Sequence, residues 1–410
     1  MDNDIAKTEH TKLNLILVFL FSLFPIAFYL GNLIINTFII LIGITYLIFL
    51  FKNNHKLIDK KILILLFFFW FTLIINLIFS NNFENSYLRV SKFLFIIFFI
   101  FAFKHLININ SKYEKYIFGV WTFILIIQII DIIFEIIFGI NITGFKSYMP
   151  GRLVSFFRDE LVVGYFFFGF SIVILAFLYQ KKFIGDKIAV LLFVLLIVLS
   201  FLIGERSNFI KTFLSIMLFL FFIIKYNYKT KIISIVFILS ILISILNLNT
   251  NYKVRYVEQM FESHKDLGIS KFSVDYFLNR TIYGKHQLTA YRMFEDNKIF
   301  GVGIKNFREQ VYKKKYVEHQ TVDLHPHQIH LELLAETGLF GYISFLIFII
   351  SSGVISLRSF IKTRNCIQFS GILFVLMSLL PIIPSGSFFS TFSSSVFWLN
   401  YAVMISYIKK

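Results

Sequence analysis

Residues 325–332 read HPHQIHLE, and residues 338–341 read GLFG. This stretch closes the long polar segment of the chain, roughly 249–327, and opens the apolar sequence that follows it. Three imidazoles therefore stand where a water-facing segment meets an apolar one. We expect a functional site at this junction, open to a substrate that has one apolar end and one soluble end.

The composition indicates a membrane protein. Hydrophobic residues make up 58% of the chain and charged residues 15%, whereas an ordinary soluble domain has about 25% charged residues. An open strand edge in lipid would leave backbone groups unpaired, so the spanning elements are predicted to be helices. The sequence therefore predicts an all-α polytopic membrane protein with about 12 transmembrane helices of about 20 residues each. The apolar runs are 13–30, 33–51, 62–79, 89–103, 116–138, 161–178, 188–204, 208–224, 232–248, 333–357, 366–383 and 393–408.

The basic residues indicate how the chain is oriented. The net charge is +17, but Lys and Arg lie mainly in alternate loops. This is the positive-inside pattern of membrane proteins, and it argues against a nucleic acid as the partner. Both termini are therefore predicted to be cytoplasmic. The segments predicted to face outward are 139–160, 204–208, 249–327 and 381–395.

The chain is predicted to have three parts. Residues 1–248 hold nine helices, residues 249–327 form a large outer loop, and residues 328–410 hold the last three helices. Within the loop, Leu288, Tyr291, Met293 and Phe294 have the spacing of an amphipathic helix that lies on the bilayer surface. A glycine pair at 301–303 is predicted to end this helix, and residues 307–316 are predicted to form a second short one.

The stretch that opens this section carries a family resemblance. His327-Gln328, nine residues and then Gly338-x-x-Gly341 resembles the signature of the O-antigen ligase family, which also includes O-antigen polymerases. A second segment, FGVGIKNF at 300–307, resembles a loop segment of that family. The resemblance implies a C-type glycosyltransferase fold in the bacterial inner membrane, with a helical periplasmic loop between the ninth and tenth helices.

The short outer loop at 204–207 reads GERS. The planar guanidinium of Arg206 suits a phosphate or diphosphate. The alternative is a helix-end arginine that Glu205 neutralises, and we favour the functional role because charges at the membrane boundary are costly. The resemblance implies an essential arginine in this loop, and Arg206 is the matching position. Glu205 beside it is predicted to be a substrate contact.

Family members also place an arginine upstream of the segment that resembles 300–307. Two residues of this chain are candidates for that role, Arg280 and Arg292. Arg280 is assigned as the catalytic residue and Arg292 as a substrate contact, and Arg292 is the alternative for the catalytic role.

His327 is the residue that the resembled motif places at the site. A neutral imidazole can accept a proton from a sugar hydroxyl, and an imidazolium can bind phosphate. The alternative is a capping or core histidine at the start of a helix. His325 and Gln328 are predicted to contact the substrate beside it, and the motif glycines are predicted to admit a neighbouring helix. A zinc site formed by His325, His327 and His330 is a weaker alternative, because this spacing is not a specific zinc signature.

The segment GRLVSFFRDE at 151–160 resembles the Gly- and Arg-rich approach to a helix in this family. The usual Asn after the acidic residue is replaced by Glu160. Arg152 and Arg158 are predicted to be secondary contacts for a polyprenyl diphosphate. Asp131 and Glu135, one helical turn apart within a span, are predicted to form local hydrogen bonds with other helices, the alternative being an ion path.

The resemblance implies a metal-independent, inverting glycan transferase without a cofactor. The donor would be a glycan on undecaprenyl diphosphate. The acceptor would be lipid A-core for a ligase, which we favour, or a second lipid-linked glycan for a polymerase. The alternative from another class is a transporter for a glycan or an anion.

Overall fold

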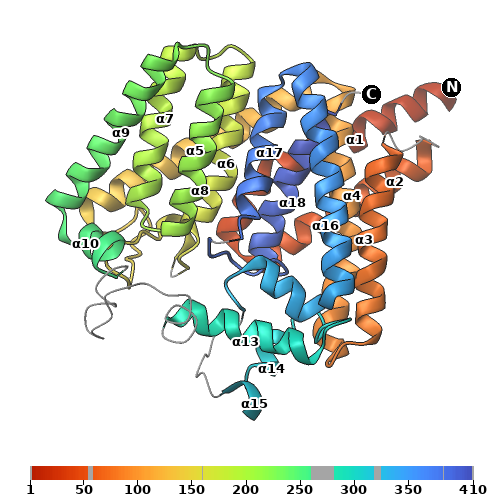
Figure 1. Cartoon of the computed structure of the whole chain (residues 1–410). Coiled ribbons are helices and arrows are strands. Elements are labelled where there is room, and N and C mark those ends of the chain that lie inside the picture. Colours follow the sequence, from red (N-terminus) through yellow and green to blue (C-terminus); the bar gives the residue numbers. More distant parts are fainter. Residues whose placement is uncertain are drawn as a thin grey trace. The chain divides into compact units, whose positions relative to one another are not determined.

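The computed structural model describes residues 2–53, 59–158, 160–259, 281–317, 325–381 and 383–408. Within these ranges all regular secondary structure is helical, as predicted (Figure 1). Each of the twelve apolar runs coincides with a helix. These helices are α1 (Asp2–Leu30), α2 (Asn32–Asn53), α3 (Lys60–Ile78), α4 (Phe83–Ile109), α5 (Ser111–Phe138), α6 (Val163–Gln180), α7 (Asp186–Leu202), α8 (Arg206–Phe222), α9 (Tyr228–Leu248), α16 (Ile329–Thr363), α17 (Cys366–Ser378) and α18 (Thr391–Ser406).

Among the described residues, eight helices are long and apolar enough to cross a membrane. They are α1 to α6, α9 and α16. The other four, α7, α8, α17 and α18, have 17, 17, 13 and 16 residues, so their crossing stays a prediction. The protein is therefore a multi-pass membrane protein, with twelve spans as the expectation.

The chain divides into two compact units, which are described separately. Unit 1 comprises Met1–Glu114, Phe272–Lys362 and Leu379–Lys410. Its central helix is α4, which packs against α2, α3 and α18. Aromatic rings fill this core: Phe93 contacts Phe69 at 5.4 Å and Trp398 at 5.1 Å between ring centroids. Residues distant in sequence thus meet around a single helix.

Unit 2 comprises Lys115–Lys271 and Thr363–Ser378. Here α6 packs against α7, α8 and α17. The rings of Phe168 and Phe374 stack with centroids 4.5 Å apart, which joins α17 to the earlier part of the chain. The short helix α10 (Thr250–Lys253) and a turn of π-helix, Val254–Glu258, follow α9.

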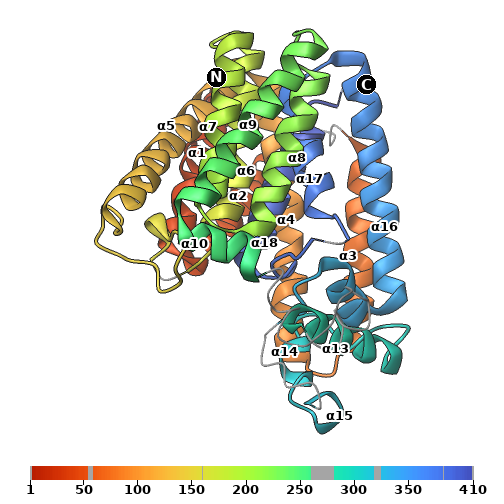
Figure 2. The same ribbon diagram turned by 60° about the vertical axis from the view of Figure 1, so that its left-hand side comes forward.

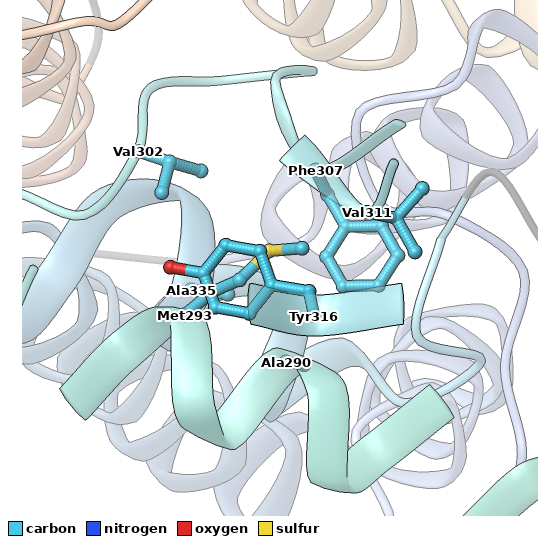
Figure 3. Close-up of a cluster of buried hydrophobic side chains, with 7 residues drawn as sticks. All are labelled: Ala290, Met293, Val302, Phe307, Val311, Tyr316 and Ala335. Carbon is cyan, nitrogen blue, oxygen red and sulfur yellow. The ribbon is translucent and has the colours of Figure 1, made fainter. Parts of the chain in front are cut away.

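The predicted loop helix is present as α13 (Ile282–Asp296). Met293 and Ala290 are fully buried against residues of the same loop and of α16 (Figure 3). The remaining members of this apolar cluster are Val302, Phe307, Val311, Tyr316 and Ala335. Of the residues that predicted the helix, Met293 is thus covered by the protein itself, whereas Tyr291 is exposed. The contact of α13 with a bilayer surface stays a prediction.

The second predicted loop helix, 307–316, is two single turns instead. These are α14 (Phe307–Gln310) and α15 (Lys314–Val317). Both views place α13 and α14 beside the ends of α3 and α16, within unit 1 (Figures 1 and 2). The loop therefore forms a small packed layer at one end of these helices.

Candidate functional site

The two motifs of unit 1 meet at a break in α16. Gly338 has φ 63° and ψ −170°, so the helix is interrupted there. The backbone N–H of Val302 donates to the Ala335 carbonyl, and that of Gly303 donates to the Glu336 carbonyl, both over 2.9 Å. On the other side of the break, the N–H groups of Leu339 and Phe340 donate to carbonyls at 298 and 299. The loop 298–303 thus occupies the gap that the broken helix leaves.

Glycine is required at this contact because the backbones are very close. A Cβ at Gly338 would lie 2.3 Å from the Ile299 carbonyl oxygen, and one at Gly301 would lie 2.5 Å from the Glu336 carbonyl carbon. Both glycines also have positive φ, which side chains disfavour. The prediction that Gly338 admits a neighbouring helix is wrong: what it admits is the backbone of the loop.

Polar residues of the same region fasten the loop further. The buried Glu336 carboxylate accepts hydrogen bonds from the backbone N–H groups of Lys305 (2.8 Å) and Phe307 (3.4 Å). The Asn306 amide donates to Ser80 Oγ over 2.7 Å. Asn76 of α3 donates to the Glu336 carbonyl over 3.1 Å. The segment 300–307 is therefore a structural joint between α3 and α16.

His327 lies just before α16 in a left-handed conformation, with φ 54°. Its carbonyl accepts a hydrogen bond from Ser385 N over 2.9 Å. Its ring is half-buried and lies 4.0 Å from the His325 ring, 5.5 Å from the His286 ring and 5.3 Å from the Tyr283 ring, between centroids. The structure therefore places His327 in an aromatic cluster shared with α13.

Gln328 is buried and caps the start of α16. Its Oε1 accepts from Leu331 N over 2.7 Å, and its Nε2 donates to the Pro381 carbonyl over 2.8 Å. These contacts give it a structural role that the sequence did not reveal. Its contact with substrate, like that of His325, stays a prediction.

His330 is engaged elsewhere. Its Nε2 lies 2.8 Å from the Leu379 carbonyl, and its Nδ1 lies 3.2 Å from the Tyr342 hydroxyl. His286 of α13, and not His330, joins His325 and His327. Within the described ranges, no group of three His, Cys, Asp or Glu residues is placed to hold a metal ion. Sequence reasoning missed His286; the only signal was a histidine on the inner face of an amphipathic helix.

In unit 2, Glu205 is buried at the start of α8 and holds several groups together. Its carboxylate accepts from Gly164 N (2.8 Å) and from Asn208 Nδ2 (2.6 Å), and lies 3.7 Å from Arg152 Nη2. Burial is the largest cause that raises the pKa of Glu205, and Arg152 opposes it. Glu205 is therefore paired with Arg152, and not with its sequence neighbour Arg206.

Arg206 is the first residue of α8 and is half-buried. Its Nη1 donates to the Arg255 carbonyl over 3.2 Å. Among the described residues, no carboxylate forms an ion pair with it. The arginine is thus held by a neutral group, with its charge uncompensated by an acid.

The backbone around Arg206 is closely packed. Gly204 has φ 80°, and a Cβ there would lie 1.8 Å from the Gly151 carbonyl oxygen. Arg255, which is buried, donates from Nε to the Gly204 carbonyl over 2.5 Å. No motif in the sequence marks Arg255. Arg152 also lines a pocket of about 230 Å³ in unit 2, together with Lys146.

Asp131 and Glu135 form local hydrogen bonds with the segment 142–155, which ends at a short 3-10 helix, Ser155–Phe157. Asp131 accepts from Ile142 N (2.8 Å) and Ser155 Oγ (2.6 Å). Glu135 accepts from Val154 N (3.0 Å) and Ser155 N (2.7 Å). Both carboxylates are buried and fasten the segment 142–155 to α5.

The remaining predicted residues are dispersed. Arg280 lies outside the described residues. Arg292 is half-buried on α13, and Arg158 is exposed with φ 60°. Arg152, Arg158, Glu205 and Arg206 belong to unit 2, whereas His325, His327, Gln328 and Arg292 belong to unit 1.

A comparison with protein families tests the resemblance that the two motifs carry. Residues 191–346 match the family model of the O-antigen ligases. Over these residues the chain is similar to the O-antigen ligases. The matched segment includes Arg206, the loop segment 300–307 and the motif from His327 to Gly341, and it confirms the resemblance. No curated protein matches the chain.

Proposed function

We propose that this protein transfers a polysaccharide from undecaprenyl diphosphate to a sugar hydroxyl of lipid A-core, at the periplasmic face of the bacterial inner membrane. One observation carries the proposal: the O-antigen ligase match spans both Arg206 and the His327 motif. An activity of the O-antigen ligase or polymerase type is supported by that match. Ligation to lipid A-core is the specific form that we propose.

The chemistry breaks the bond between the anomeric carbon and the diphosphate oxygen. Negative charge develops on the departing lipid diphosphate, and a fixed guanidinium stabilises such charge best where water is excluded. Arg206 suits this role because its charge is not compensated by a carboxylate within the described residues. A second arginine, Arg280 or Arg292, would contact the same diphosphate, with Arg152 and Arg158 as secondary contacts.

The acceptor hydroxyl attacks the anomeric carbon from the side opposite the diphosphate, so the configuration inverts. His327 accepts the proton of that hydroxyl, which is a general-base role suited to a neutral imidazole. The energy for transfer is stored in the diphosphate linkage. In this proposal no nucleotide, metal or other cofactor takes part.

The segments predicted to face outward lie together within each unit. In unit 1, the N–H of Ser385 donates to the His327 carbonyl, which joins 381–395 to 249–327. In unit 2, Arg255 Nε donates to the Gly204 carbonyl, and Arg152 Nη2 lies 3.7 Å from Glu205 Oε1, which joins 204–208 to the segments 249–327 and 139–160. This arrangement supports a proposal in which both termini are cytoplasmic and the site is periplasmic.

The test is a transfer assay with the purified full-length protein in lipid vesicles. It is supplied with a glycan on undecaprenyl diphosphate and with lipid A-core, and the products are separated by size. We expect glycan on lipid A-core, at an unchanged rate in excess EDTA. Lengthened glycan on the diphosphate carrier would instead identify a polymerase. Flux across the vesicles without bond formation would identify a transporter, and activity lost in EDTA and restored by zinc would overturn the metal-independent mechanism.

A further inference from the structure

A second polar site lies in unit 1, apart from the residues that the sequence singled out. It is a pocket of about 360 Å³ between α2, α4 and the start of α14. Four cationic side chains line it: Arg89, Lys92, Lys305 and Arg308. The one carboxylate in its lining is Glu84, which is exposed. The pocket therefore concentrates positive charge from segments that are more than 200 residues apart in the chain.

The contacts that fix these cations come from neutral groups. Arg89 Nη1 donates to Thr391 Oγ1 over 2.9 Å, and Lys305 Nζ donates to Ser387 Oγ over 2.6 Å. Lys92 donates to Asn36 Oδ1. Arg308 Nε is buried without a hydrogen-bond partner among the described residues. In the part of the chain that the structure describes, none of the four forms an ion pair.

The nearby buried acids do not reach into the pocket. Glu332 accepts from Ser387 Oγ (2.5 Å) and from Phe388 N (2.8 Å), and Glu336 accepts from the backbone of Lys305 and Phe307. Their hydrogen bonds hold the loops in place. Burial is the largest cause that lowers the pKa of Lys305; Glu332 and Glu336 oppose it, while Arg308 and Arg89 lower it further. The two acids therefore offset part of the repulsion among the cations of this pocket, and an anion bound in the pocket would offset more of it.

One wall of the pocket is apolar. Ile40 of α2 and Leu88 of α4 line it, with 37% and 60% of their surface exposed. Both helices are long and apolar enough to cross a membrane. The pocket is thus lined both by cationic side chains and by apolar side chains of helices that are long enough to cross a membrane. A ligand that satisfies both has an anionic head and a hydrocarbon chain.

We propose that this pocket binds the phosphate headgroup of a membrane amphiphile. Arg89 and Arg308 donate to the phosphate oxygens, because the planar guanidinium matches phosphate geometry. Lys305 and Lys92 add charge, and the hydrocarbon chain lies against Ile40 and Leu88. This site requires no glycan transfer, so it is independent of the proposed reaction.

The experiment measures binding of fluorescent phosphatidic acid to the purified full-length protein in nanodiscs of neutral phosphatidylcholine. The variants are Arg89→Gln and Arg308→Gln, and the matched control is Lys298→Gln, an exposed cation of the same unit outside the pocket. Each arginine variant should bind about tenfold more weakly, since one charge-assisted hydrogen bond is lost. The control should bind as the unaltered protein does. Wild-type affinity in either folded arginine variant overturns the proposal.

A second part of the experiment distinguishes a lipid ligand from a free phosphate compound. Inorganic pyrophosphate is titrated as a competitor against the bound phosphatidic acid. Displacement only at much higher concentration supports an amphiphile, because the apolar wall then contributes to binding. Displacement at equal concentration overturns the amphiphile as the ligand. Arg308→Lys, which keeps the charge and disturbs the fold least, should recover part of the affinity; recovery of none would count against a phosphate contact at this position.

Discussion

Both units use buried carboxylates to fasten loops, but they treat nearby cations differently. In unit 2, Glu205 holds the backbone of Gly164 and is paired with Arg152 at 3.7 Å. In unit 1, Glu336 holds the backbone of Lys305, while the Lys305 ammonium donates to a serine. Glu205 therefore forms an ion pair with a cation, whereas Glu336 acts on the charge of Lys305 without a direct ion pair among the described residues.

The difference shows where a ligand is needed. A buried carboxylate with several hydrogen-bond donors is explained by the fold, so Glu205 and Glu336 require no substrate to account for them. Cations held only by neutral groups are not explained in this way. Arg206 in unit 2 and Arg89 in unit 1 are of this second kind, and Arg308 Nε has no hydrogen-bond partner among the described residues. The predictions below test that distinction, beginning with the largest effect.

The largest effect is expected from Arg206→Ala, tested beside His327→Ala. Loss of one fixed donor to a developing charge lowers a rate by about 10²–10³-fold, and loss of a general base lowers it by about 10²–10⁴-fold. Arg206→Lys should recover only part, since a point charge cannot make the bidentate contact. The measurement is initial rate in the vesicle assay, with the exposed Arg358→Ala as control. If only one of the two alanine variants is inactive, the other residue is not catalytic.

An intermediate effect on stability is expected at the two backbone contacts. Gly204→Ala in unit 2 and Gly338→Ala in unit 1 would each add a Cβ within 2.3 Å of a carbonyl oxygen at positive φ. Such strain costs about 1–3 kcal/mol. Thermal unfolding in detergent should show a lower midpoint for both variants.

Matched controls exist within the same units. Gly119→Ala in α5 and Gly353→Ala in α16 place a Cβ where no heavy atom lies within 4 Å. Since alanine favours a helix over glycine by about 1 kcal/mol, these variants should be as stable as the parent or more so. Equal midpoints for all four variants would disprove the assigned role of the two contacts.

The smallest effect is expected from the other imidazoles of unit 1. His330→Ala should lower the transfer rate less than tenfold, because its two nitrogens are engaged by Leu379 and Tyr342 and a structural hydrogen bond contributes only about 1 kcal/mol. His325→Ala should be similarly mild. Rates from the same assay decide this point, and inactivity of both variants together with zinc dependence would assign the three histidines to a metal.

The sequence by itself determined the helical class, the positions of the apolar runs and the presence of a loop helix around 288–294. It also singled out Arg206, the segment 300–307 and the motif at 327–341. These features are local: apolar length, amphipathic spacing and short motifs are visible in neighbouring residues.

Only the tertiary structure decided which polar groups meet. Glu205 pairs with Arg152 and not with Arg206, and His286 and not His330 joins the histidine cluster. The cationic pocket combines Arg89 with Arg308, and Gly338 receives a loop backbone and not a helix. Each of these contacts joins segments that are dozens to hundreds of residues apart. The neighbouring residues in the sequence do not predict such a contact, because the contact forms only when the helices pack and bring distant segments together.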